Sequence, residues 1–261
     1  MNQPFPLPSE FGPEPTLGNP SSTQAENPET KPDARTEPPA TATTGKQPRT
    51  VFPTIFAFPP NRDTMGGTAY LLLEPTGNVL IDCPAWDEIN REFIEAQGGI
   101  RWLFLTHRGS MGKVKEIQQA FQCQILVQEQ EAYLLPGLEL TSFQHTFQLS
   151  PSSEAIWTCG HSPGSACLYH RHYGGILFTG RHLLPNAQGQ PVPLRIAKTF
   201  HWPRQIQNVE NLRQRFTAAT LSAICPGANT GFLRGQRAIS NAYEQLAQLD
   251  LNACLQAKPG L

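Results

Sequence analysis

The sequence lacks any apolar run long enough to cross a membrane. The longest such runs among its 261 residues, for example AYLLL and GGILF, fall far short of the roughly 20 residues that a spanning helix needs. The N-terminus, MNQPFPLPSEFGPEP, also lacks the basic start and apolar core of a secretory signal. These absences predict a cytoplasmic protein without a membrane partner.

An excess of charge of one sign is missing as well. Lysine and arginine number 20, aspartate and glutamate 21, and the formal net charge is −1, so no overall field would attract nucleic acid. The six cysteines form no CxxC pair and lie mostly in apolar segments, which predicts reduced, buried thiols. The sequence contains no phosphate-binding loop, dinucleotide fingerprint or serine-hydrolase elbow.

Proline is abundant only at the N-terminal end of the chain. Residues 1–50 hold eleven of the 25 prolines and very few aliphatic side chains. Such a segment cannot bury enough apolar surface to offset the entropy lost on ordering. The sequence therefore predicts a disordered Pro/Thr/Glu-rich arm at 1–50 and one folded domain at 51–261.

The domain alternates between strand and helix patterns. Strand patterns occupy 51–59, 68–74, 79–83, 101–106, 124–128, 145–150, 154–160, a hairpin within 166–180, and 221–227. Helical spacing predicts helices at 86–99, at 110–121 with Ser110 as N-cap, at 203–219 and at 233–256. This order favours sheets covered by helices.

Five apolar strands end in short loops that contain Gly, Pro or small polar residues. Their sequences are LIDCPAW, LTHRGSMG, TCGHSPGSA, LFTGRHLL and AICPGANTG. Loops at the carboxyl ends of strands are where such scaffolds usually build a site. The sequence therefore predicts a functional site where these loops meet.

The order of these motifs resembles the metallo-β-lactamase fold superfamily of hydrolases. The matching features are Asp82 in LIDCP, His107 in LTHRGSMG, His161 in HSPGS, GGILFTG before Arg181, and CPG at 225–227. The resemblance covers almost all of the folded domain. It implies an α+β fold, a four-layer αββα sandwich with two mixed sheets between layers of helices.

The resemblance also implies a T-H-x-H-x-D-H motif and two zinc ions that activate a water molecule. Of the seven usual ligands, only His107 and His161 remain. The other positions carry residues that cannot replace those ligands: Gly109, Met111, Gly112, Arg181, and Ala228 or Asn229. We therefore expect no two-zinc site and no cofactor; the alternative is one zinc, iron or manganese ion on His107 and His161.

These losses favour a degenerate hydrolase-family protein, in effect a pseudoenzyme. Arg181 would place a permanent cation where a carboxylate bridged the metals, which suits a small anionic ligand, or an unknown protein could bind there. Two alternatives are a one-metal hydrolase of an ester, thioester or phosphoester, and an interaction protein that acts through its proline-rich arm. The candidate ligand-binding residues are Asp82, His107, His161, Arg181 and His182.

A second histidine pair, His170 and His172, is spaced so that both rings lie on one face of a strand. The surrounding sequence, YHRHYGG, predicts instead a solvated hairpin turn. The sequence leaves open whether the protein is an enzyme, which residues would be catalytic, and the oligomeric state.

Overall fold

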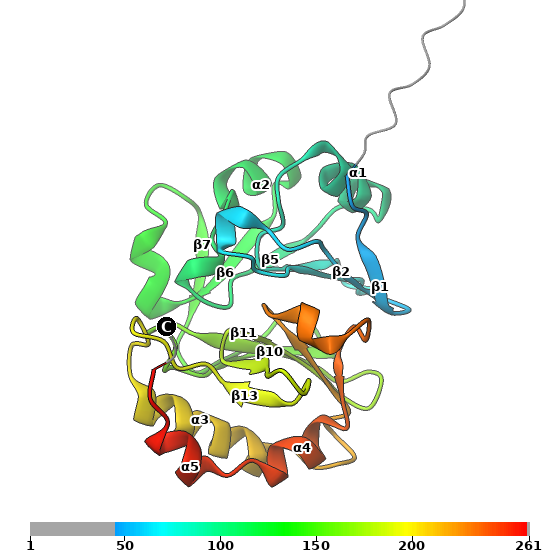
Figure 1. The fold of residues 1–261 in the computed structure, drawn as a ribbon. Coiled ribbons are helices and arrows are strands. Elements are labelled where there is room, and N and C mark those ends of the chain that lie inside the picture. Colours follow the sequence, from blue (N-terminus) through cyan, green and yellow to red (C-terminus); the bar gives the residue numbers. More distant parts are fainter. Residues whose placement is uncertain (1–44, 260–261) are drawn as a thin grey trace, which may run out of the picture. The chain divides into compact units, whose positions relative to one another are not determined.

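The computed structural model describes residues 45–259. The predicted arm up to residue 44 lies outside the described residues, whereas residues 49 and 50 already form the start of the first strand. Figure 1 shows two sheets with helices on their outer faces. The first sheet has seven strands in chain order: β1 (Arg49–Phe52), β2 (Ile55–Ala57), β3 (Tyr70–Leu72), β4 (Val79–Ile81), β5 (Trp102–Phe104), β6 (Gln124–Gln128) and β7 (Leu140–Phe143).

The second sheet has six strands in the order β15-β14-β11-β10-β9-β8. A separate two-stranded hairpin, β12–β13, follows β11 in the chain. The bounds are β8 (Thr146–Gln148), β9 (Ser153–Trp157), β10 (Ala166–His170), β11 (Ile176–Gly180), β12 (Leu183–Pro185), β13 (Pro191–Pro193), β14 (Ala223–Pro226) and β15 (Ile239–Ser240).

Both sheets are mixed. Strands β1 to β4 pair antiparallel, and β4 to β7 pair parallel. In the second sheet β11 and β14 are parallel and the remaining pairs are antiparallel. Because parallel strands end at the same edge of a sheet, the loops after β4 and β5 lie together, as do the loops after β11 and β14.

The core follows from the alternation of side chains along the strands. Tyr70 and Phe104 of the first sheet face inward and pack in one buried cluster with Leu168 and Phe178 of the second. Tyr70 and Phe178 meet edge to face, with ring centroids 5.3 Å apart. Since successive residues of a strand point to opposite faces, the intervening positions face the helices.

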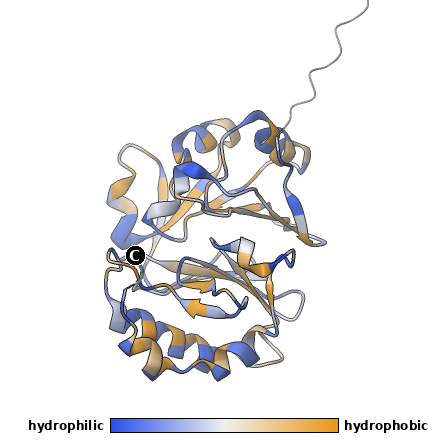
Figure 2. Cartoon of the chain, in the orientation of Figure 1, coloured by the Kyte–Doolittle hydropathy of each residue, from blue (hydrophilic) through white to orange (hydrophobic). Residues whose placement is uncertain are grey.

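The helices close the two outer faces. Ile94 and Ile117 from α1 and α2 pack on the outer face of the first sheet, and Val209 and Leu246 from α3 and α4 pack on that of the second. Their exposed sides are hydrophilic (Figure 2). The bounds are α1 (Glu88–Ala96), α2 (Val114–Phe121), α3 (Trp202–Arg215), α4 (Ala242–Gln248) and α5 (Leu251–Gln256). The predicted αββα sandwich is confirmed.

Two predicted elements are wrong in detail. The single strand at 51–59 is a hairpin, β1–β2, with Pro53 and Thr54 in its turn. The segment 233–256, predicted as one helix, instead forms a loop, the short strand β15 and two helices. Asn241 interrupts the helical pattern with a left-handed φ of 49°. Asp250 begins a new helix, because its side chain accepts a hydrogen bond from the Ala253 N–H.

Ser110 is not the N-cap of α2. It ends a short 3₁₀ helix, η2 (Arg108–Ser110), and its hydroxyl donates to the His107 carbonyl at 2.7 Å. Within the described part of the chain, no helix combines the length and apolar character that crossing a membrane requires.

Candidate functional site

The site forms where four strand-end loops converge. Asp82 follows β4, His107 follows β5, His161 lies between β9 and β10, and Arg181 follows β11. The parallel pairing of β4 with β5 brings the first two together. The Ala166 N–H donates to the Thr106 carbonyl, which joins the edges of the two sheets beside the histidines.

Asp82 stabilises the loop that carries His107 by accepting hydrogen bonds from it. It has a left-handed φ of 61° and is buried, and its carboxylate accepts the Thr106 N–H at 2.8 Å and the Thr106 hydroxyl at 2.7 Å. Burial raises the pKa of Asp82 to about 6, although the hydrogen bonds from Thr106 and the charge of Arg181 oppose the rise. Above that pH, Asp82 is an ionised hydrogen-bond acceptor.

The Thr106 hydroxyl fixes the tautomer of His107. Its oxygen lies 2.9 Å from His107 Nδ1 while its single proton is donated to Asp82. The ring must therefore donate from Nδ1, so that Nε2 keeps its lone pair. Nε2 is buried and has no hydrogen-bond partner among the described residues. Asp82 thus acts on the site through Thr106 and does not face it as a free ligand.

His107 and His161 form the centre of the site. Their ring centroids are 5.2 Å apart in an edge-to-face arrangement. Burial, followed by the charge of Arg181, lowers the pKa of His161 to about 4, and burial holds the pKa of His107 well below its usual value. Both imidazoles are neutral at neutral pH, and within residues 45–259 His161 Nδ1 has no hydrogen-bond partner.

His182 adds a third neutral imidazole. It is almost fully buried, and neither of its ring nitrogens has a partner in the described part of the chain. Burial, then the neighbouring His161, lowers its pKa to about 3. Helix α3 fixes its backbone, because the Gln205 side-chain amide donates to the His182 carbonyl at 3.1 Å.

Arg181 reaches across to the loop between β2 and β3. Its Nη2 donates to the Thr64 carbonyl at 3.1 Å and to the Met65 carbonyl at 2.8 Å, while its buried Nε has no partner among residues 45–259. These carbonyls lie at the end of a 3₁₀ helix, η1 (Arg62–Thr64). The guanidinium therefore holds this loop beside His107, with part of its donor capacity unused.

Gly180 makes the close approach of these loops possible. It has a left-handed φ of 50°, and a Cβ there would lie 2.6 Å from Thr106 Cβ. On its other side, a Cβ on Gly227 would lie 2.7 Å from the Gly180 Cα. The strand ends of β5, β11 and β14 are thus packed against one another with no space for side chains at these two positions.

The side chains present do not fit a two-zinc centre. Among residues 45–259, no three His, Cys, Asp or Glu side chains are grouped so that they could hold a metal ion. Asp82 is engaged by Thr106, and the guanidinium of Arg181 cannot be a metal ligand. The described residues therefore offer no set of ligands for a two-zinc centre.

The sequence missed several residues that shape the site. Thr106 sets the tautomer of His107, and the Thr64 and Met65 carbonyls bind Arg181. Buried Glu131 accepts the Gly164 N–H at 3.1 Å and so supports the HSPGS loop; burial raises its pKa. Only Thr106 had a sequence signal, its place in LTH; the other contacts join distant parts of the chain.

The predicted solvated turn at the second histidine pair is wrong for His170. This residue is buried at the end of β10, and its Nδ1 lies 3.2 Å from Glu74 Oε1 and 2.9 Å from Ser153 Oγ. Ser152 donates to the other Glu74 oxygen at 3.0 Å. His172 is exposed, as predicted.

Comparisons with known proteins place the fold. No protein-family model matches the sequence, and no curated protein matches it. A metallo-β-lactamase family protein from Thermus thermophilus aligns with a TM-score of 0.58 at 14% identity, over 78% of this chain and 80% of that one. A Cronobacter sakazakii metallo-β-lactamase with a HARLDQ motif gives a TM-score of 0.55 at 17% identity, over 81% and 96%.

An archaeal metallo-β-lactamase superfamily protein from Sulfolobus tokodaii gives a TM-score of 0.52 at 14% identity, over 74% of this chain and 85% of that one. The chain therefore has the metallo-β-lactamase fold, as the strand-end motifs indicated.

Proposed function

We propose that this protein is a degenerate member of the metallo-β-lactamase-fold hydrolases, which binds a small anionic ligand beside Arg181 and does not carry out two-zinc hydrolysis. The observation that carries the proposal is a set of buried polar atoms without partners among the described residues: Arg181 Nε, with His107 Nε2 and His161 Nδ1, whose rings feel its charge, and both ring nitrogens of His182 next to His161. Action in the cytoplasm is part of the same proposal.

Unpartnered buried groups favour a ligand on energetic grounds. Each costs about 1–3 kcal/mol relative to a hydrogen-bonded group, so a molecule that bonds to several of them gains affinity. The sign of the local charge selects an anion, because Arg181 is charged while His107 and His161 are neutral. The charge of Asp82 opposes this, but its oxygens are directed at Thr106.

Thermal unfolding with added anions tests the proposal. We expect low millimolar phosphate or sulfate to raise the melting temperature above that in chloride of equal ionic strength. Arg181→Gln should abolish the increment even where it lowers the starting melting temperature. Arg171→Gln removes an exposed arginine outside the site and should keep the full response. Equal increases in melting temperature in the wild type and both variants would show that the anions act by general exclusion from the protein surface, and would reject the site.

A second candidate function is hydrolysis at a single metal ion. It is favoured by the free lone pair of His107 Nε2 and the nearby unpartnered His161 Nδ1. Elemental analysis of tag-free protein from cells grown with zinc, iron and manganese separates the two functions. About one metal per chain that His107→Ala removes would support this candidate, because a catalytic site needs a retained ion. Metal content far below that level in the wild type would reject it.

A further inference from the structure

A second pair of histidines lies at the end of the sandwich opposite the candidate site. His170 ends β10 and is buried, and His172 follows it in the exposed turn between β10 and β11. Their ring centroids are 5.0 Å apart, with an angle of 54° between the ring planes. Two imidazoles that bind one tetrahedral metal ion through nitrogens about 2.0–2.1 Å from it have their centroids at about this separation. The pair therefore has the spacing of two ligands of one ion.

The hydrogen bonds around Glu74 set the tautomer of His170. The Ser153 hydroxyl donates its single proton to Glu74 Oε1, and its oxygen lies 2.9 Å from His170 Nδ1. Glu74 Oε1 itself lies 3.2 Å from the same nitrogen. Both neighbours of Nδ1 are thus acceptors, so the ring carries a proton on Nδ1 and, when neutral, keeps a lone pair on Nε2. A neutral imidazole with a free lone pair is the form that binds metal ions.

The environment of His170 is that of a metal-binding histidine. Its Nε2 is buried and has no hydrogen-bond partner among residues 45–259. A histidine that binds a metal through one ring nitrogen commonly donates from the other to a carboxylate, which fixes the ring and raises its basicity. Glu74 supplies this carboxylate. Although burial opposes it, the hydrogen bonds from His170 and the neighbouring serines hold the pKa of Glu74 at about 2, so the carboxylate is ionised at neutral pH.

The turn that carries His172 is held by backbone hydrogen bonds on both sides of this residue. The Arg171 N–H donates to the Ser152 carbonyl at 2.8 Å, and the Gly175 N–H donates to the His172 carbonyl at 3.0 Å. Because this backbone is already fixed beside His170, binding would order little more than the exposed side chain of His172, which keeps the entropy cost of binding low.

We propose that His170 and His172 bind one divalent transition-metal ion, with zinc as its representative. Imidazole nitrogens favour zinc, copper and nickel, whereas magnesium and calcium prefer oxygen ligands. Among residues 45–259 no third His, Cys, Asp or Glu side chain completes the group, so water fills the remaining positions and the ion is exchangeable. Such an ion would tie the turn between β10 and β11 to Glu74 and so reinforce the link between the two sheets.

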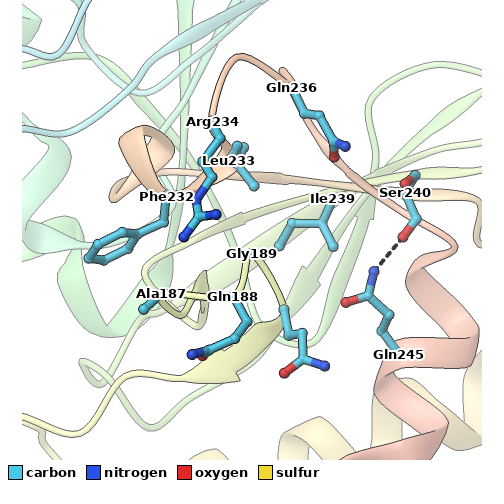
Figure 3. A pocket seen from close by; sticks show the side chains of 11 residues that line it. Ala187, Gln188, Gly189, Phe232, Leu233, Arg234, Gln236, Ile239, Ser240 and Gln245 are labelled. Atoms are coloured by element: carbon cyan, nitrogen blue, oxygen red, sulfur yellow. Dashed lines mark hydrogen bonds between the residues drawn. The ribbon is translucent and has the colours of Figure 1, made fainter.

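Other parts of the described chain compete poorly for this ion. A groove of about 620 Å³ between the β12–β13 turn and α4 has no His, Cys, Asp or Glu among the described residues that line it (Figure 3). His201 is exposed, but its Nδ1 accepts the Arg204 N–H at 3.2 Å. The main rival is the pair His107 and His161, whose ring centroids are 5.2 Å apart. A test must therefore separate the two histidine pairs.

Calorimetric titration of the tag-free full chain with zinc chloride, after removal of bound metal with a chelator, tests the proposal. We expect zinc to bind at neutral pH and magnesium chloride to give no binding. His172→Gln should weaken zinc binding at least about tenfold, since the loss of a residue that only orients a metal ligand already costs about 10–100-fold. Because His172 is exposed, this variant should fold as the wild type does.

His145→Gln is the matched control, because it removes an exposed histidine whose ring lies beside Trp157 and outside the pair. This variant should bind zinc as the wild type does. His107→Ala should keep the ion whose affinity depends on His172. The proposal is overturned by the absence of zinc binding or by equal affinity in the wild type and His172→Gln. Loss of the ion in His107→Ala but not in His172→Gln would also overturn it and assign the ion to the candidate site.

Discussion

The two ends of the sandwich hold their buried carboxylates in different environments. Because β3 and β4 are antiparallel, Glu74 after β3 and Asp82 after β4 lie at opposite ends of the first sheet. In the same way, His170 at the end of β10 and His161 before its start lie at opposite ends of the second sheet. At one end Glu74 joins the two sheets by pairing with His170. At the other end Asp82 binds Thr106 of its own sheet, and the Thr106 carbonyl accepts the Ala166 N–H of the second sheet.

The carboxylates at the two ends are held differently. Glu74 is hydrogen-bonded by His170 and neighbouring serines, although His170 Nε2 has no partner among the described residues, whereas Asp82 is bound by Thr106. Burial alone would raise the pKa of Glu74, but hydrogen bonds from His170, Ser150, Ser152 and Ser153 outweigh it and hold the pKa at about 2. At the other end, burial prevails and raises the pKa of Asp82 to about 6, and three histidines keep nitrogens without partners among the described residues. The end that leaves several nitrogens without partners beside a cation is therefore the better candidate for a binding site, and the Glu74 end is the better candidate for a structural link.

The largest expected loss of stability comes from steric crowding at the Asp82 end of the sandwich. Gly180→Ala would force a Cβ against Thr106 while keeping a left-handed φ. We expect a loss of about 4 kcal/mol in unfolding free energy, from overpacking together with backbone strain. Urea denaturation measures it.

Gly66→Ala is the control for the backbone term. Gly66 has a φ of 75°, but no described residue lies within 4 Å of the position its Cβ would take. Its cost should be about 1–2 kcal/mol, from backbone strain alone. Similar losses in both variants would contradict the tight contact between Gly180 and Thr106.

The next largest expected loss of stability comes from removing the carboxylate of Glu74. Glu74→Ala leaves His170, Ser152 and Ser153 without their shared acceptor, and we expect a loss of about 3 kcal/mol in unfolding free energy at neutral pH. The pKa of Glu74 is about 2 in the folded state, below the value of about 4.3 for an unperturbed glutamate. The stability that Glu74 contributes is therefore complete above about pH 4.3 and is lost as the pH falls through 2. Urea unfolding at several pH values should show wild type and variant converging over that interval.

Glu92→Ala removes an exposed carboxylate from α1 and is the matched control. It should change stability by less than about 0.5 kcal/mol at every pH. A constant difference between wild type and Glu74→Ala down to pH 2 would show that the loss is one of packing and not of charge.

The smallest expected effect is that of Asp82→Asn, whose pH dependence has the opposite sign to that of Glu74→Ala. The folded-state pKa of Asp82 is raised, so its stabilising contribution is full below about pH 3.9 and is lost as the pH rises through 6. Asp82→Asn should remove this slope and change stability at neutral pH by only about 1 kcal/mol. If the unfolding free energy of Asp82→Asn, measured in the same urea series, keeps the wild-type slope between these pH values, then another group causes the pH dependence.

Local patterns predicted most of the secondary structure but not the contacts of the site. Apolar alternation identified the strands, and helical spacing identified α1, α2 and α3. The predicted helix at 233–256 was wrong because its spacing is compatible with a helix, while the left-handed Asn241 and the strand pairing of Ile239 with Ile224 interrupt it. Such interruptions depend on neighbours that lie far away in the sequence.

The candidate site shows the same limit. Strand-end motifs predicted that Asp82, His107, His161 and Arg181 would come together, and the loops that carry them do converge. No local pattern indicated that Arg181 would bind the Thr64 and Met65 carbonyls, 117 and 116 positions away. The local pattern also predicted a solvated turn where His170 is buried against Glu74.

The sequence by itself determined most of the strands and helices and the order of the loops, since each depends on residue type and local spacing. Tertiary structure alone decided which polar atoms are satisfied. It paired Glu74 with His170, directed Asp82 to Thr106 and left the histidines beside Arg181 without partners among the described residues. The reason is that a hydrogen bond depends on distances between chain segments, and those distances are set only when the two sheets pack.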